Sequence, residues 1–356
     1  MSPRLGVTTK LTADGRTMLR ASYGRFSQGV LTGEYGSFHP GVAPVTTRRF
    51  DAATGGYTTL ISVLDSKTQL RLDPEIRAPR TDEYSVGVDR QVGRQLTATL
   101  AYVRKDGANF IGYEEVGGQY SQQTRPLPNG GSVPVLALVN ATGARRFLLT
   151  NPEGFSMTYN GLVTTLEKRQ SHGWRAFGSY TFSRAEGLQV SSGTAAAGEQ
   201  LSTLTSSGTF GRDPNNLTNA RGRLANDRPH MFRVMGSVDV PRTGFVVAAN
   251  FQHFSGKPWA ASTQVTLPQG DQRILLEPPG SRRLSSQSLL DLRVSRTLRF
   301  GGAGRVELFM DLLNLLNDTA EEGLAADNFF SSTFGQPTVF MNPRRAMMGA
   351  RLNLGR

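Results

Sequence analysis

The sequence contains no cysteine among its 356 residues. This absence excludes disulfide frameworks, thiolate nucleophiles, zinc-thiolate sites and iron-sulfur clusters. No apolar run approaches the roughly 20 residues that a transmembrane helix requires, which excludes a helical membrane protein. Hydrophobic residues make up only 38% of the chain, against the roughly 45 to 50% of an ordinary globular domain. A large conventional core is therefore not expected.

An export signal is also missing, because the first six residues contain no charged segment followed by an apolar one. As written, the chain is either intracellular or lacks its true beginning. Its 40 Lys and Arg residues outnumber 28 Asp and Glu residues, giving a net charge of +12. Such a charge can indicate nucleic acid or an anionic surface as a partner. The basic residues are dispersed instead of gathered on one segment, so we expect no nucleic-acid partner.

Short segments of alternating apolar and polar residues recur along the chain in pairs. A tight turn joins the members of each pair, and the first turn contains Asp14-Gly15, which suits a hairpin with positive φ. Longer polar and Gly-rich stretches separate the pairs. The expected strands are Leu5 to Thr9, Thr17 to Phe26, Asp82 to Val92, Gln95 to Lys105, Ser156 to Arg169, Trp174 to Arg184, Met231 to Val240, Phe245 to Phe254, Leu289 to Phe300, Arg305 to Leu316 and Arg345 to Leu354.

About eleven strands of about ten residues each would have the length that crosses a bilayer at a tilt of about 45°. All the tight turns follow odd-numbered strands, and all the long loops follow even-numbered ones. Outer-membrane barrels show this asymmetry, with short periplasmic turns and long extracellular loops. We therefore predict an all-β fold that forms part of an antiparallel transmembrane β-barrel. Residues 305–316 also fit helical spacing, but strict alternation after the Gly-rich turn at 301–304 favours a strand.

Alternation within the strands predicts one face for lipid and one for a wet lumen. In the strand from Met231 to Val240, for example, Phe232 and Val234 share one face, while Arg233 and Asp239 share the other. Inward arginines could pair with inward carboxylates or meet anionic ligands. The candidate lumen residues are Arg20, Arg233, Asp239, Asp291, Arg293, Glu307, Asp311 and Arg351.

Aromatic residues are frequent near the strand ends, where a barrel carries its interfacial girdles. The expected girdle residues are Tyr23, Phe26, Tyr84, Tyr102, Tyr159, Trp174, Tyr180, Phe182, Phe251, Phe254 and Phe300. A half-buried soluble sheet would show similar alternation and aromatic content. A soluble or surface-exposed β-rich binding module therefore remains an alternative.

Catalytic motifs are nearly absent. The four histidines, His39, His172, His230 and His253, show no metal-ligand spacing, and the sequence has neither a nucleophile elbow nor a phosphate-binding glycine pattern. The polar loop from Gly211 to His230 has carboxylates and amides that could hold a hard cation, but such residues more commonly form local turn hydrogen bonds. We expect no enzymatic activity, no cofactor and no metal.

Several short motifs, taken in order, resemble the barrel of TonB-dependent outer-membrane receptors, specifically the Oar-like group. They are Ser2-Pro3-Arg4-Leu5-Gly6, Arg20-Ala21-Ser22-Tyr23-Gly24-Arg25-Phe26, Thr81-Asp82-Glu83-Tyr84-Ser85-Val86-Gly87, Asn226-Asp227-Arg228-Pro229-His230, Phe254-Ser255-Gly256-Lys257-Pro258 and Asp311-Leu312-Leu313-Asn314-Leu315-Leu316-Asn317. The resemblance covers nearly the whole chain.

The resemblance implies a 22-stranded barrel in the cell outer membrane, filled by an N-terminal plug. Residues 1–356 would form its C-terminal half. The signal peptide, the plug, the first half of the wall and the segment that contacts the TonB energy-coupling complex would be absent. Such a receptor contacts outer-membrane lipid and admits a substrate through its extracellular loops and lumen, without covalent chemistry. Oligosaccharide, peptide and metal chelate all remain open as substrates.

Half a barrel would expose unpaired backbone groups to hydrocarbon at its two edges, at a cost of several kcal/mol per group. We therefore expect the sequence to be a truncated gene product or a partial sequence. Its final residue, Arg356, departs from the aromatic end that such barrels commonly carry. A self-contained small barrel with an even strand number, acting as a passive channel, is a further alternative.

Overall fold

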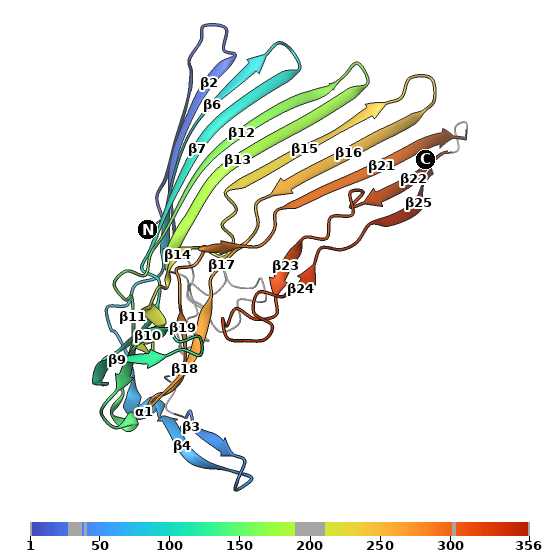
Figure 1. Cartoon of the computed structure of the whole chain (residues 1–356). Helices are drawn as coiled ribbons and strands as arrows, with labels where there is room; N and C mark the ends of the chain where they lie inside the picture. Colours follow the sequence, from blue (N-terminus) through green and yellow to red (C-terminus); the bar gives the residue numbers. More distant parts are fainter. Residues whose placement is uncertain (1, 28–37, 39–40, 189–210, 301–303, 355–356) are drawn as a thin grey trace.

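A single curved sheet of long antiparallel strands dominates the computed structural model, which describes residues 2–27, 38, 41–188, 211–300 and 304–354 (Figure 1). Eleven strands follow one another in chain order across this sheet. They are β1 (Arg4–Lys10), β2 (Thr17–Ser27), β6 (Arg80–Val92), β7 (Leu96–Ala108), β12 (Met157–Ser171), β13 (Trp174–Leu188), β15 (His230–Asp239), β16 (Phe245–Phe254), β21 (Gln287–Arg299), β22 (Gly304–Leu313) and β25 (Arg345–Leu354). The short β14 (Arg221–Arg223) adds to the loop end of β13.

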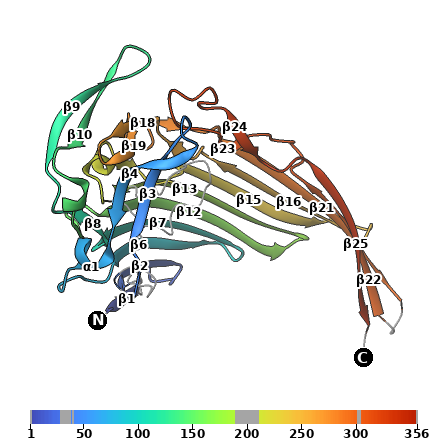
Figure 2. The same ribbon diagram turned by 90° about the horizontal axis from the view of Figure 1, so that it is seen from below.

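The expected strands are confirmed, with ends that differ by only a few residues. The helical alternative for residues 305–316 is wrong, because β22 pairs along its whole length with β25. The turn between β21 and β22 was expected at Gly301 to Gly304, and residues 301–303 lie outside the described part. Strands β1 and β25 are the two edges of the sheet and lie far apart (Figure 2).

The strand register assigns each side chain to a face, because residues opposite each other in an antiparallel pair point to the same side. Val234 lies opposite Phe251 in the register, and Phe251 lies opposite Leu290. Exposed apolar side chains continue along this face to the last strand, where Met348 is 82% and Leu352 60% exposed. Such exposure on a whole sheet face requires an apolar environment. We call this side of the sheet the apolar face and the opposite side the polar face.

The long connections at one end of the sheet form small sheets of their own (Figure 1). We expected only polar, Gly-rich stretches there, but short apolar runs within them pair locally. Their elements are β3 (Val45–Asp51), β4 (Gly56–Leu64), α1 (Ser66–Gln69), β5 (Leu70–Leu72), β8 (Gly112–Glu115), β9 (Tyr120–Pro126), β10 (Ser132–Leu138), η2 (Thr142–Ala144), β11 (Phe147–Thr150), η4 (Pro214–Leu217), β17 (Pro258–Trp259), β18 (Ser262–Leu267), β19 (Gly270–Leu275), β20 (Arg282–Arg283), β23 (Glu321–Leu324) and β24 (Pro337–Phe340).

The buried hydrophobic clusters of the described residues also lie at this end. One joins β10 to β18 and β19 and contains Val135, Ala137 and Ile274. A second contains Ile111 and Leu149, and a third lies at the base of the loops. The hydrophobic side chains of the chain, though few, are thus concentrated in the loop layer and on the apolar face. No helix in the described ranges has the length and apolar character needed to cross a membrane.

Candidate functional site

The polar face carries all eight residues that the sequence singled out. Arg293 and Asp311 lie opposite each other on β21 and β22. The Nε and Nη2 atoms of Arg293 donate to the two carboxylate oxygens of Asp311 at 2.5 and 2.6 Å. One strand further, Arg351 of β25 lies opposite Glu307 with an Nη1 to Oε2 distance of 3.4 Å. These two arginines therefore pair with carboxylates of the candidate set.

The other four candidates have partners that the sequence did not indicate. Arg20 pairs with Asp89 of β6 at 2.5 Å. Arg233 donates to Gln252 at 2.8 Å, and Asp239 accepts from Gln170 at 3.0 Å. The Oδ1 of Asp291 accepts from the backbone N–H of Asn314 at 2.9 Å. Register between strands distant in sequence decides these partners, so alternation alone could place the residues on one face but could not pair them.

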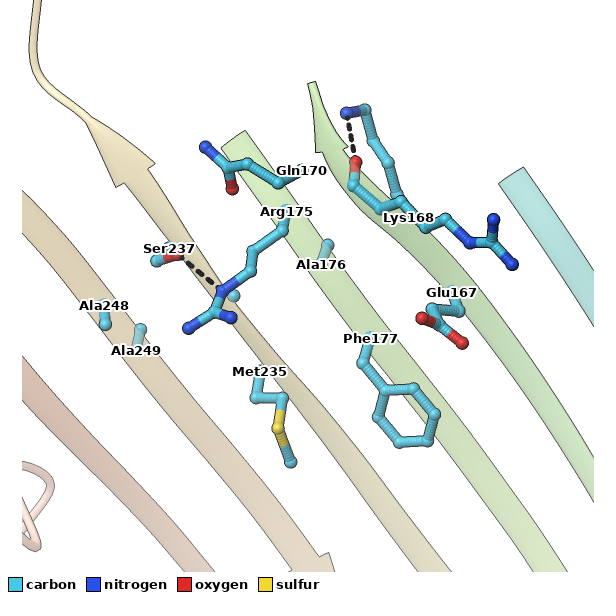
Figure 3. Close-up of a pocket in the computed structure, with 12 residues that line it drawn as sticks. Glu167, Lys168, Gln170, Arg175, Ala176, Phe177, Met235, Ser237, Ala248 and Ala249 are labelled. Atoms are coloured by element: carbon cyan, nitrogen blue, oxygen red, sulfur yellow. Dashed lines mark hydrogen bonds between the residues drawn. The ribbon is translucent and has the colours of Figure 1, made fainter. Parts of the chain in front are cut away.

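A pocket of about 540 Å³ lies on the polar face over β12, β13, β15 and β16. Its lining includes the apolar residues Phe177, Met235 and Ala248 (Figure 3). It also contains four charged residues, Glu167, Lys168, Arg169 and Arg175. The Nε of Arg175 donates to the hydroxyl of Ser237 at 3.1 Å. Sequence reasoning did not single out this pocket, because its members come from two hairpins, β12–β13 and β15–β16. Alternation could have placed Glu167 and Arg175 on the polar face, but not together.

Aromatic residues form two belts on the apolar face. Near the loops, the rings of Tyr23 and Tyr84 contact each other at a tilt, with centroids 5.1 Å apart, and Tyr180 and Phe182 continue the belt on β13. Near the turns, the Lys168 ammonium lies 4.0 Å from the Trp174 ring centroid. The two belts correspond to the interfacial girdles of a membrane barrel. Three expected girdle residues, Phe26, Tyr159 and Phe254, share the register of the polar face and do not belong to the belts.

Two of the sequence motifs, the one that ends at Phe26 and the one that begins at Thr81, contact each other beside the aromatic belt near the loops. Arg25 donates from Nε and Nη2 to the carboxylate of Asp82 at 2.7 and 3.1 Å. The Tyr23 hydroxyl donates to the same carboxylate at 2.8 Å. This cluster links β2 to β6 at the end of the strands where the loops begin.

Two further motifs meet around a buried carboxylate. The side chain of Asp227 is fully buried, with the Nη2 of Arg283 at 2.5 Å and the Nη1 of Arg223 at 3.8 Å. The Oδ1 of Asp227 also accepts from the backbone N–H of Ala185 at 2.7 Å. The next residue, Arg228, donates to the backbone carbonyl of Ser255 at 2.8 Å. The loops after β13 and β16 are therefore joined at their base by charge-assisted hydrogen bonds.

The asparagines of the last motif end strand β22. Asn314 and Asn317 have φ values of 49° and 53°, in the left-handed region that Asn tolerates better than most residues. The Nδ2 of Asn314 donates to the carbonyls of Asp318 and Asn342 at 2.9 and 2.8 Å. These bonds draw both ends of the loop between β22 and β25 together.

In the polar loop that was considered as a cation site, the carboxylates of Asp213 and Asp227 bind other groups of the protein. Asp213 caps η4, where its Oδ1 accepts from the backbone N–H and the Nδ2 of Asn215 at 3.0 and 2.7 Å. Burial raises the pKa of Asp213 above its usual range, and burial together with a hydrogen bond to Glu115 raises the pKa of Tyr120 nearby. Within the part of the chain that the structure describes, three or more His, Asp or Glu side chains do not gather at a metal-binding distance.

Three of the four histidines lie in the described ranges. His230 bonds the Tyr180 hydroxyl through Nδ1 at 2.8 Å, and His253 bonds Ser288 at 2.8 Å. His172 occupies a turn with a φ of 55°. His39 lies outside the described residues.

Comparisons with known proteins agree with this geometry. Residues 1–273 match the family described as outer membrane beta barrel domain, and the chain belongs to this family. Its fold resembles the outer membrane transporter YddB from Escherichia coli, with a TM-score of 0.56 and 13% identity over 98% of this chain and 40% of that one. The siderophore receptor PirA from Acinetobacter baumannii gives a TM-score of 0.51 and 13% identity over 99% of this chain and 40% of that one. No curated protein sequence matches.

The protein is thus an outer-membrane β-barrel protein whose fold is that of part of a TonB-dependent receptor barrel. It spans about 40% of the length of these two structures. The matched family is defined by its outer-membrane β-barrel domain. The alternative of a soluble β-rich module is wrong, because the sheet is a single layer whose apolar face is exposed and the family belongs to the outer membrane.

Proposed function

We propose that this chain is the C-terminal part of the barrel wall of an Oar-like, TonB-dependent receptor that imports its substrate actively. The observation that carries the proposal is the eleven-stranded sheet with a charged polar face, an apolar face and a folded loop layer at one end. A self-contained passive channel would need β1 and β25 to pair with each other, whereas they stand at opposite edges of this sheet. The interlocking of the Oar-like motifs at the base of the loops further supports the proposal.

In this function the polar face forms part of the lumen wall. Arg20, Arg233, Asp239, Asp291, Arg293, Glu307, Asp311 and Arg351 keep it hydrated and hold its shape through pairs across the strands. The loop layer captures the substrate, because loops on a rigid scaffold can vary while the scaffold stays fixed. The energy-coupling complex acts through a region that precedes the wall.

The test is whether the full-length protein engages the coupling partner. The protein, produced from its complete reading frame and extracted from outer membranes, is mixed with the immobilised periplasmic domain of TonB from the same organism. We expect retention that is lost when the region upstream of the barrel is deleted. Equal retention of the deleted protein, or no retention of the complete one, would contradict TonB-dependent transport.

A further inference from the structure

The charged residues of the apolar face are distributed unequally between its two ends. Near the loops, the arginines of this face pair with carboxylates of the same face. These pairs are Arg25 with Asp82 at 2.7 Å, Arg104 with Asp106 at 2.8 Å, and Arg184 with Glu186. The register places all of them on the side of the sheet that carries Tyr84. The positive charge at the loop end therefore has carboxylate partners within the protein.

The turn end of the same face, opposite the loop layer, carries cations without carboxylates (Figure 1). Its cations among the described strand residues are Arg90, Lys168 and Arg296, which we call the cationic rim. None of the three forms an ion pair with a carboxylate of the described ranges. The strand carboxylates toward this end all belong to the polar face, and they are Asp89, Glu167, Asp239 and Glu307.

Neutral groups of the protein hold two of the rim cations in place. The Nζ of Lys168 lies 4.0 Å from the centroid of the Trp174 ring and donates to the Ser171 hydroxyl at 2.7 Å. The guanidinium of Arg296 lies 5.1 Å from the Phe245 ring centroid. At a membrane interface such a ring contacts the apolar layer, while the cation beside it reaches the headgroups. Aromatic and hydroxyl partners leave the positive charge uncompensated.

The turns at this end add further positive charge. Arg94 and Arg242 are exposed in the turns after β6 and β15. Asp14, in the turn after β1, acts on Arg90 only at longer range and lies 3.9 Å from Arg16. The short turns of an outer-membrane barrel face the periplasm. The cationic rim therefore lies at the headgroups of the periplasmic leaflet, where the described residues do not neutralise it.

We propose that the cationic rim binds anionic phospholipids of the periplasmic leaflet. The guanidiniums of Arg90 and Arg296 donate to the lipid phosphate, since their planar fork matches phosphate geometry. Lys168 contributes its charge, because its ammonium already donates to carbonyl oxygens of the turn. The proposal goes beyond the transport function and requires only the outer-membrane location of the wall.

The experiment measures binding of dioleoyl phosphatidylglycerol and dioleoyl phosphatidylcholine to the full-length protein in detergent by native mass spectrometry. We expect phosphatidylglycerol to bind about tenfold more tightly, because a basic residue near an anionic lipid surface strengthens binding by about fivefold at low salt. Replacing the rim by Arg90→Gln, Lys168→Gln and Arg296→Gln together should lower this preference about fivefold or more. Binding of phosphatidylcholine should not change.

Arg299→Gln combined with Arg305→Gln is the matched control. These two arginines lie opposite each other at the turn end of the polar face, without a carboxylate partner among the described residues. They differ from the rim because they face away from lipid, so their replacement should keep the wild-type preference. Heat-modifiable migration on gels would show that each variant is folded.

Equal binding of the two lipids by the wild type, or an equal loss of preference in the control, would overturn the proposal. Displacement of phosphatidylglycerol by an excess of inorganic phosphate would also contradict it, because the ligand would then be a free anion. Retention of the preference in that excess, together with its loss in the rim variant, would support a lipid site.

Discussion

Asp227 shows how a single residue holds the loop layer to the wall. Its carboxylate is completely buried, and its partners Arg223 and Arg283 come from two different loops. Removing one member of a buried ion pair leaves an uncompensated charge. We expect Asp227→Asn to destabilise the protein by about 2 to 3 kcal/mol, near the lower end for buried pairs because both guanidiniums are partly exposed.

The lower stability of Asp227→Asn would be measured as a lower midpoint of urea unfolding in detergent. The matched control is Asp106→Asn, which removes a carboxylate that is 36% exposed and pairs with Arg104, and it should cost less than about 1 kcal/mol. Equal midpoints for the two variants would show that the Asp227 cluster does not fasten the loops.

Asp213 makes the loop layer sensitive to pH. Burial raises the pKa of its carboxyl group, so its contribution to stability is complete below the unfolded pKa and is lost as pH rises through the folded one. The neutral amide in Asp213→Asn does not titrate. We therefore expect the melting temperature of Asp213→Asn to rise relative to the wild type between pH 4 and pH 7. A difference that stays constant over this range would be inconsistent with a raised pKa.

At the scale of the strand, alternation gives a direct prediction. Cysteines introduced at Val234 and Leu292 should react slowly with a membrane-impermeant maleimide in intact outer membranes, because both positions lie on the apolar face. Cysteines at Arg233 and Asp291, their immediate neighbours on the polar face, should react much faster. Similar rates at neighbouring positions would mean that the apolar face does not contact lipid.

The strands could be predicted from the sequence because a two-residue period persists over ten residues and tight turns recur between them. Strand β22 shows the strength of this signal, since five apolar residues at helical spacing did not prevent it from pairing with β25. The loop sheets were missed because runs such as Leu70–Leu72 and Phe147–Thr150 are too short to show a period. The same limit applies to the pocket, where only the register brings Glu167, Phe177 and Met235 side by side.

At the scale of the molecule, the direction of the edge strands limits what can close the wall. Because neighbours are antiparallel and the path has eleven strands, β1 and β25 run in the same direction. Antiparallel closure therefore requires a complementary wall with an odd number of strands. A second copy in the same membrane orientation would present parallel edges and cannot supply it.

We accordingly expect residues 1–356, produced with a signal peptide but no other barrel segment, to give no heat-modifiable band in outer membranes. Exposed strand edges in hydrocarbon cost several kcal/mol per unpaired group. The complete reading frame serves as the control and should give such a band. A stable, heat-modifiable product from residues 1–356 alone would refute this account of the edges.

The separate hydrophobic clusters of the loop layer have a consequence for how barrels of this kind diversify. Each cluster is built from loops that begin and end at fixed strands of the wall. Removal of apolar side chains from water stabilises each cluster, whereas the apolar face of the wall is stabilised by contact with lipid. A mutation that remodels one cluster can thus alter the surface of the loop layer without disturbing the strands of the wall. Evolution can exchange these surface modules while the membrane scaffold is inherited unchanged.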